Sequence, residues 1–190
     1  FKNYVLGTMF YRYISENLAA YINAGEHAAG DTSFDYARLP DEAALEARDD
    51  LVQEKGFFIL PSELFCNVLA KAAKGETWEV EEEDPATHEK KKKVIYLNEK
   101  LEQIFRNIVE SAKGSVSESS FEGLFDDFDV NSNKLGSTVQ KRNERLAKLL
   151  GGVHDMNLGS VQDHDIDAFG DAYEYLMTMY ASNAGKSGGE

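Results

Sequence analysis

Apolar residues recur every three or four positions over the first part of the chain, which predicts a long amphipathic helix. Gly25 marks the expected end of this helix. Many of the apolar side chains are aromatic, and a wide apolar face is typical of a helix that packs on several neighbours. The positions that carry the pattern are Leu6, Met9, Phe10, Tyr13, Ile14, Leu18, Tyr21 and Ile22.

Weaker patterns follow this first helix. Residues 30–40 have the composition of a loop, and an acidic, alanine-rich helix is predicted from Pro40 towards Glu54. Residues 57–60 form a short apolar run that predicts buried, extended chain. Ser62 is the expected N-cap of a further helix through Ala72.

Three later helices are predicted. An apolar period from Leu97 to Val109 indicates a strong amphipathic helix that ends near Gly114. Residues 137–140 have the form of a capping box, which would open a helix to about Leu150, before Gly151 and Gly152. Asp165 is the expected cap of a last helix, and residues 183–190 resemble a loop. The inner side of that last helix is expected to carry Ile166, Phe169, Tyr173, Leu176, Met177 and Tyr180.

The composition changes between residues 76 and 93. An acidic block, which includes residues 81–84, precedes Pro85, and lysines occupy residues 90–93. Opposite charges around a turn residue indicate an exposed hairpin or a flexible insertion, and a solvated loop explains the same residues. If strands form, Trp78 and Val80 are expected to face Val94 or Tyr96.

These patterns predict a mainly α fold, an irregular α-helical bundle with at most a small β-hairpin. Residues 1–182 would form one helical domain, with residues 76–93 as its charged hairpin or flexible insertion. The hydrophobic share of 42% and the charged share of 28% fit a folded protein.

Charge and cysteine content narrow the function classes. The 20 basic and 34 acidic residues give a net charge of −14, which opposes a chain that wraps nucleic acid unaided. A lone cysteine, Cys66, favours a reducing, cytoplasmic setting, and its apolar neighbours predict a small buried side chain and not a nucleophile. No apolar run is long enough to cross a bilayer, so no membrane partner is expected. The first residue is not Met, and we expect the native N-terminus to lie further upstream.

Two short motifs resemble ligand sites and then fail. Asp129, Asn131 and Asn133 alternate like calcium ligands, but the positions that need Gly and Glu carry Lys134 and Gln140. Residues 185–187, Gly-Lys-Ser, lack the earlier glycine and the preceding strand of a phosphate-binding loop. Neither predicts a bound ion or nucleotide.

The histidines support no catalytic arrangement. His154 and His164 lie among aspartates, but their spacing matches no metal-ligand pattern. Capping and loop solvation explain them, so no metal ligand is predicted.

A basic stripe is the one surface feature that the sequence offers as a contact. Steps of 100° per residue place Lys141, Arg145 and Lys148 in a narrow arc of the helix that begins near Ser137. Such a stripe can lie along a phosphate backbone or an acidic partner, and an ordinary solvated helix face explains it equally well. The opposite side of the helix carries Val139, Leu146 and Leu150.

Several stretches resemble, in the same order, the modification subunit of type I restriction–modification systems. They are residues 1–7 with 10–16, 56–61, 121–127, 129–136, and 167–176 through to 188–190. The charged segment 76–93 has no counterpart in this pattern.

The resemblance implies a subunit that moves a methyl group from S-adenosylmethionine to the exocyclic amine of adenine in DNA. In that family the catalytic domain follows the helical one, so residues 183–190 would be a linker towards a catalytic domain absent from this chain. The cofactor site is accordingly expected just after Glu190. The Asn-Pro-Pro-aromatic motif of the catalytic domain is missing, since the only prolines are Pro40, Pro61 and Pro85.

We therefore expect this chain alone to be inactive and not to bind S-adenosylmethionine. The implied partners are the DNA-specificity subunit, DNA within the complex, and the restriction subunit.

Two other classes remain open from the residues alone. One is an acidic helical adaptor for protein interactions, with no enzymatic activity. The other is a small metal-binding protein.

Overall fold

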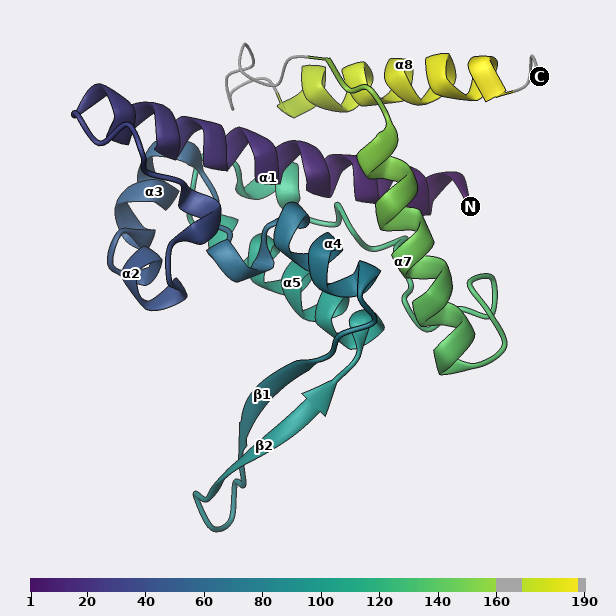
Figure 1. Ribbon diagram of the computed structural model, residues 1–190, viewed down its shortest axis with the longest axis horizontal. Coiled ribbons are helices and arrows are strands. Elements are labelled where there is room, and N and C mark those ends of the chain that lie inside the picture. The colour runs from purple at the N-terminus through teal and green to yellow at the C-terminus, as the bar shows by residue number, and fades with distance from the viewer. Residues whose placement is uncertain (160–168, 188–190) are drawn as a thin grey trace.

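The longest helix, α1 (Lys2–Ala28), crosses the computed structural model, and other elements pack along it (Figure 1). The structure describes residues 1–159 and 169–187, without the side chains of 169–173 and 185–187. Helix α8 (Phe169–Ser187) lies along one side of α1, and α4 (Phe65–Ala73) and α5 (Leu97–Ala112) lie on the other. The predicted mainly α fold is confirmed.

Helix α1 buries its first two thirds, as its apolar period predicts. Gly25 does not end it, which corrects the sequence prediction. The last turns are exposed to solvent, where a glycine only weakens a helix by about 1 kcal/mol and does not break it. Tyr21 is also exposed, and its hydroxyl donates a hydrogen bond to Glu54.

The segment between α1 and α4 differs from its prediction in two ways. The single helix expected after Pro40 is two, α2 (Asp41–Glu46) and α3 (Arg48–Lys55), which meet at Ala47. Short 3-10 turns flank them, at Tyr36–Arg38 and at Pro61–Glu63. Ser62 does not cap α4: its hydroxyl and its N–H both donate to Asp41, so it ties the second turn to α2.

Cys66 is exposed on α4, and this corrects the buried position expected for it. The apolar face of α4 is formed by Phe65, Val68 and Ala72, and Cys66 lies one residue past Phe65 on the outer side. Partial burial of the thiol raises the pKa of Cys66. A raised pKa leaves less thiolate, so the side chain is a poor nucleophile.

Helices α5 and α7 (Val139–Asp155) follow the predicted periods with small shifts. A short helix, α6 (Glu118–Phe121), and a series of turns connect them. Thr138, not Ser137, caps α7, because its hydroxyl accepts the N–H of Lys141. The helix continues through Gly151 and Gly152, since the buried Val153 on the next turn keeps this part against the core.

The core is rich in aromatic rings that join α1 and α5 to the turns before α7. The ring of Phe105 stacks on Phe125 at 4.1 Å and meets Tyr11 and Phe128 edge-on. Gly7 makes room for Phe128, because a Cβ at this position would lie 2.9 Å from the ring. A glycine inside the longest helix therefore has a packing reason.

Strands β1 (Trp78–Glu83) and β2 (Lys90–Ile95) form an antiparallel hairpin that projects away from the helices (Figure 1). Trp78 pairs with Ile95, and Val80 pairs with Lys93. The expected pairing of Trp78 and Val80 with Val94 or Tyr96 is therefore wrong. Val94 and Tyr96 are half exposed, whereas Trp78 and Ile95 are buried at the base.

Helix α8 extends to Ser187, so residues 183–187 are helical and not the predicted loop. Leu176 is buried, and the hydroxyl of Tyr175 donates to the carbonyl of Leu158. Met177 and Tyr180 are partly buried against the core. The predicted cap Asp165, the inner position Ile166 and the side chains of Phe169 and Tyr173 lie outside the described residues.

Candidate functional site

The predicted basic stripe lies on the solvent side of α7. Lys141, Arg145 and Lys148 are all exposed, while Leu146 and Leu150 are buried on the opposite side. Val139 was expected on that inner side, but it is 45% exposed. The position of Val139 at the start of α7 explains this, because the first turn extends past the core.

Arg145 makes a contact that fixes its place. Its guanidinium lies 5.1 Å from the centroid of the Phe1 ring, a cation–π distance. The middle of the stripe thus lies beside the N-terminal end of α1. Three exposed cations on one helix face can meet phosphates or carboxylates, so the arrangement suits a contact with a larger partner.

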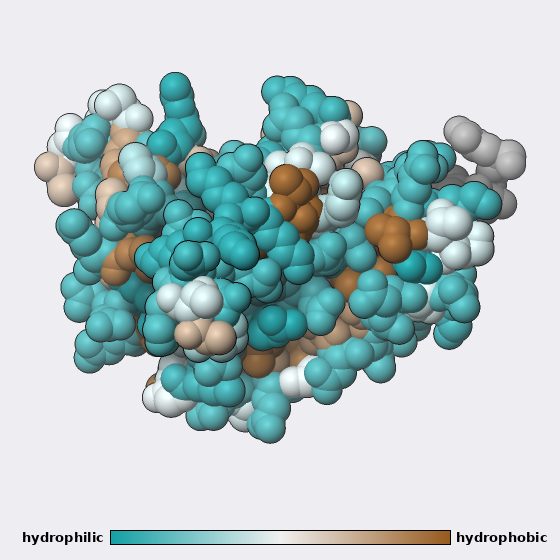
Figure 2. Space-filling view, turned by 90° about the horizontal axis from the view of Figure 1, so that it is seen from below, coloured by the Kyte–Doolittle hydropathy of each residue, from teal (hydrophilic) through white to brown (hydrophobic). Residues whose placement is uncertain are grey.

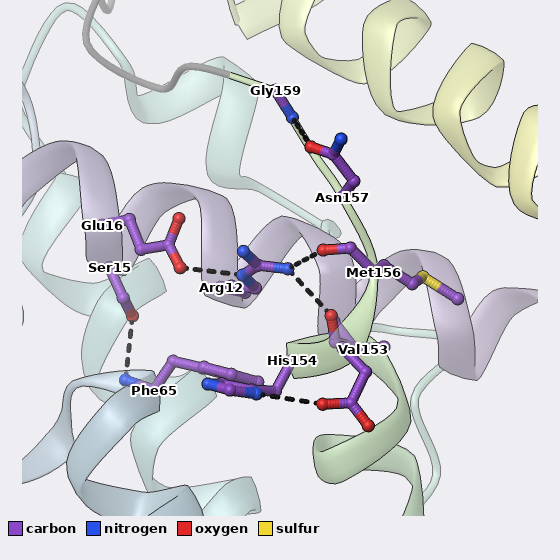
Figure 3. A network of polar contacts seen from close by, with 10 residues as sticks. Arg12, Ser15, Glu16, Phe65, Val153, His154, Met156, Asn157 and Gly159 are labelled. Carbon is purple, nitrogen blue, oxygen red and sulfur yellow. Dashed lines mark hydrogen bonds and ion pairs between the residues drawn. The ribbon is translucent and has the colours of Figure 1, made fainter.

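Arg12 joins α1 to the end of α7, a link that no pattern in the sequence predicted (Figure 3). One nitrogen of its guanidinium donates to the carbonyls of Val153 (2.9 Å) and Met156 (2.6 Å), and Nε donates to Glu16 at 2.7 Å. The last carbonyls of a helix lack partners within it, and a cation there also meets the negative end of the helix dipole. The available signal was that Arg12 and Glu16, four residues apart, are the charged residues between positions 3 and 25.

A buried carboxylate, Glu63, lies between the second 3-10 turn and α5. It accepts hydrogen bonds from the amide of Asn107 at 3.0 and 3.3 Å. Burial raises the pKa of Glu63, and the nearby Lys100 and the Asn107 hydrogen bond partly offset this. Its backbone carbonyl also accepts the hydroxyl of the buried Tyr11. These contacts join α1, α5 and the turn, which is a structural role.

The residues that resembled calcium ligands form a turn. Asp129 accepts the N–H of Asn131, and the Asn131 side chain accepts from the amide of Asn98. The hydroxyl of Tyr4 donates to the carbonyl of Asp129. Within residues 1–159 and 169–187, no three His, Cys, Asp or Glu side chains are grouped in a way that could hold a metal ion.

Other positions that the sequence analysis considered are only partly described. His154 contacts the neighbouring Asp155 at 3.3 Å, and both are exposed (Figure 3). The Gly-Lys-Ser segment at 185–187 ends helix α8, so its chain is not the strand-to-helix loop that cradles a phosphate. His164 lies outside the described residues, and so does Glu190, after which the cofactor site was expected.

A groove of about 700 Å³ opens beside the base of the hairpin, and no pattern in the sequence predicted it. It runs between the end of α4, the base of the hairpin, the start of α5 and the first half of α7. Its walls are mostly small or apolar, and its two charged residues are Glu76 and Glu144. No periodicity marks such a groove, because its residues come from three separate stretches of the chain, 72–77, 96–97 and 139–147.

No helix in the described part of the chain combines the length and apolar character needed to cross a membrane.

Comparisons with known proteins agree with this architecture. The family model of the HsdM N-terminal domain matches residues 1–153. The chain belongs to the HsdM N-terminal domain family. A second family model, N-6 DNA methylase, matches residues 164–190, which include helix α8.

The chain is similar to two proteins of type I restriction systems, each about three times its length. The chain is 43% identical over 194 residues to the type I restriction enzyme MpnII methylase subunit of Mycoplasma pneumoniae. It also resembles the crystal structure of the type I restriction-modification system methyltransferase subunit from Streptococcus thermophilus, with a TM-score of 0.58 and 25% identity over 93% of this chain. The chain spans 33% of the length of each of these two proteins.

Proposed function

We propose that this HsdM N-terminal domain is the helical part of a type I DNA methyltransferase subunit that modifies adenine. In this proposal the chain contributes to assembly with a DNA-specificity subunit and to closure on DNA. A catalytic domain that follows it transfers the methyl group. The observation that carries the proposal is the succession of matches, with the HsdM N-terminal domain over residues 1–153 and N-6 DNA methylase from residue 164.

The described residues do not fit S-adenosylmethionine, which is the methyl donor in this proposal. A Rossmann-type cofactor site needs a buried strand followed by a glycine-containing loop and a helix. The strands of the described part, β1 and β2, form an exposed antiparallel hairpin. We therefore assign the cofactor to the catalytic domain, and this chain by itself is expected to be inactive. A cofactor site that begins just after Glu190 stays a prediction.

The net charge of −14 shapes the role that we assign to the chain. An acidic domain repels DNA at long range, so it does not drive binding by itself. Lys141, Arg145 and Lys148 can still make a local contact once other subunits hold the DNA nearby. We propose that this stripe meets the DNA backbone in the closed complex, with the restriction subunit as a further partner of the full assembly.

The catalytic part of the proposal is tested with the full-length subunit and its specificity subunit. Labelled methyl groups from S-adenosylmethionine should appear on the exocyclic amine of adenine in DNA that carries the recognition sequence. The 190-residue chain with the same specificity subunit should transfer none. Methyl transfer to cytosine, or none by the full complex, would contradict the proposal.

The stripe is tested in the same assembled enzyme. Changing Lys141, Arg145 and Lys148 to Glu should weaken DNA binding at least about tenfold. If all three meet phosphates, the slope of log affinity against log salt should fall by about 2.7. A matched variant with Lys74, Arg106 and Lys113 changed to Glu alters the net charge equally and should change affinity far less. If both triple variants weaken DNA binding equally, the loss follows from net charge alone, and the stripe makes no specific contact with DNA.

A further inference from the structure

The groove at the hairpin base has an apolar floor that the helical bundle leaves uncovered. It lies where α4 ends, where α5 begins and along the first half of α7. Figure 2 views the molecule from the hairpin side, where apolar patches interrupt a largely hydrophilic surface. The apolar side chains that line the groove are Ala72, Tyr96, Leu97, Val139 and Ala147.

Two of these side chains, at the starts of α5 and α7, are exposed to solvent. Tyr96 is 51% exposed and Val139 is 45% exposed. Apolar residues scattered singly on a surface are ordinary, but apolar walls that enclose a concave volume mark a binding site. Both side chains are therefore accessible to a partner that packs against the groove.

The charges of the groove restrict the occupant. Glu76 lies on the wall before β1, and Glu144 lies on α7. Neither forms an ion pair with another described residue, and Glu144 accepts only a hydrogen bond from Gln140. Two exposed carboxylates beside an apolar floor favour a partner with cations next to an apolar face, and they repel phosphate groups.

The length of the groove suits a helix. The wall that α7 supplies runs from Val139 to Ala147, eight steps of 1.5 Å, or about 12 Å. Apolar side chains at positions i, i+3, i+4 and i+7 of a helix span about 10.5 Å, which is nearly the same distance. The wall that α7 supplies is helical and has no free strand edge to which an extended peptide could add as a further strand.

We propose that this groove binds an amphipathic helix of a partner subunit, with an apolar stripe of about two turns and flanking Lys or Arg residues. Its apolar face covers Tyr96 and Val139, and its cations pair with Glu76 and Glu144. The inference rests on the proposed function in one respect, namely that the partner belongs to the same assembled enzyme.

The first test places a photo-crosslinking phenylalanine derivative at Val139 or at Tyr96 in the assembled, DNA-bound enzyme. Mass spectrometry of the product should identify a basic amphipathic helix of another subunit at both positions. The same probe at Val116, which is 85% exposed and lies after α5, should not reach that helix. Crosslinks to DNA, to another part of the same subunit, or to nothing would overturn the inference.

The second test uses substitutions at exposed positions, which should leave the fold intact. Val139→Lys should weaken association with the partner subunit at least about tenfold, and Val116→Lys should leave it unchanged. Tyr96→Ser serves as a second groove variant, and thermal unfolding checks that each variant is folded. The double change Glu76→Lys and Glu144→Lys should weaken association similarly, whereas Glu46→Lys on α2 should not.

The two proposals fail in different ways. Normal association of Val139→Lys and Tyr96→Ser in an enzyme that methylates adenine would refute the groove inference and leave the proposed function intact. A complex that assembles through the groove but never methylates adenine would refute the proposed function alone.

Discussion

The aromatic core and the charged hairpin differ in what brings their side chains together and in how much this stabilises the fold. In the core, Phe105 of α5 contacts rings from α1 and from the turns before α7. In the hairpin, Glu81, Glu82 and Glu83 pair across the strands with Lys92, Lys91 and Lys90, all exposed to solvent. Buried rings stabilise a fold by removing apolar area from water, whereas exposed opposite charges contribute little because water screens them. The stability of this domain therefore resides in the core.

The largest expected effect follows from truncating the core. Phe105→Ala should lower the free energy of unfolding by about 3–5 kcal/mol, since it leaves a cavity among Tyr11, Phe125 and Phe128. Urea unfolding followed by circular dichroism measures this loss. Val94→Ala on the hairpin removes a half-exposed side chain and should change stability by less than about 0.5 kcal/mol. Similar losses for the two variants would contradict the comparison.

The next largest effect concerns the link between α1 and α7. Arg12→Met keeps most of the side-chain volume but removes the donors to the carbonyls of Val153 and Met156. Because Arg12 is only 15% exposed, we expect a loss of about 2–3 kcal/mol in the free energy of unfolding. Hydrogen exchange should show earlier opening of the last turn of α7. Arg106→Met, at an exposed pair with Glu102, is the control and should have almost no effect.

A smaller effect, which depends on pH, is expected at Glu63. Because burial raises the pKa of Glu63 in the folded protein, the folded state binds a proton more tightly than the unfolded state does. The contribution of Glu63 to stability is therefore greatest at low pH, and it falls as pH rises from about 4.5 through the folded-state pKa.

Glu63→Gln should flatten this part of the pH profile, measured by urea unfolding between about pH 4 and pH 8. At neutral pH the free energy of unfolding should change by no more than about 1.5 kcal/mol. Removing the buried charge of Glu63 stabilises the folded state, and losing its attraction to Lys100 destabilises it, so the two effects offset each other. The exposed Glu110→Gln provides the control. An unchanged pH slope in Glu63→Gln would show that other groups set it.

The smallest effect is expected from removing most of the hairpin. Replacing residues 80–93 by Asn-Gly keeps Trp78 and Ile95, the buried pair at the base. The free energy of unfolding should fall by less than about 1 kcal/mol, because opposite charges that are exposed to solvent contribute little. A loss as large as that of Phe105→Ala would mean that the hairpin stabilises the helices.

The sequence predicted correctly those features that depend on residues close to one another along the chain. The apolar period from Leu97 to Val109 gave α5 almost as observed, because burial on one helix face leaves a repeat in the sequence. The end of α1 was predicted wrongly at Gly25, since the exposed helix tolerates a glycine. Ser62 was predicted as a cap, but Asp41 on another segment takes both of its donors.

The same distinction applies to the candidate site. Lys141, Arg145 and Lys148 were placed on one exposed face by helix geometry alone, and the structure has all three exposed. Their role in binding stays a prediction. The link from Arg12 to α7 and the groove were not found. The two carbonyls of α7 that Arg12 binds lie more than 140 positions away in the sequence, and the groove walls come from three separate stretches of the chain.

By itself, the sequence determined the helical class, the apolar faces, the acidic charge and the resemblance that the family match confirms. These properties depend on residue types and on spacings within one element. Only the tertiary structure decided the pairing of Trp78 with Ile95, the clamp of Arg12 on α7 and the groove between Tyr96 and Val139. Each of these depends on how separate elements pack against one another. That packing is fixed by the close fit of the whole core, so no single segment carries a repeating pattern that would predict it.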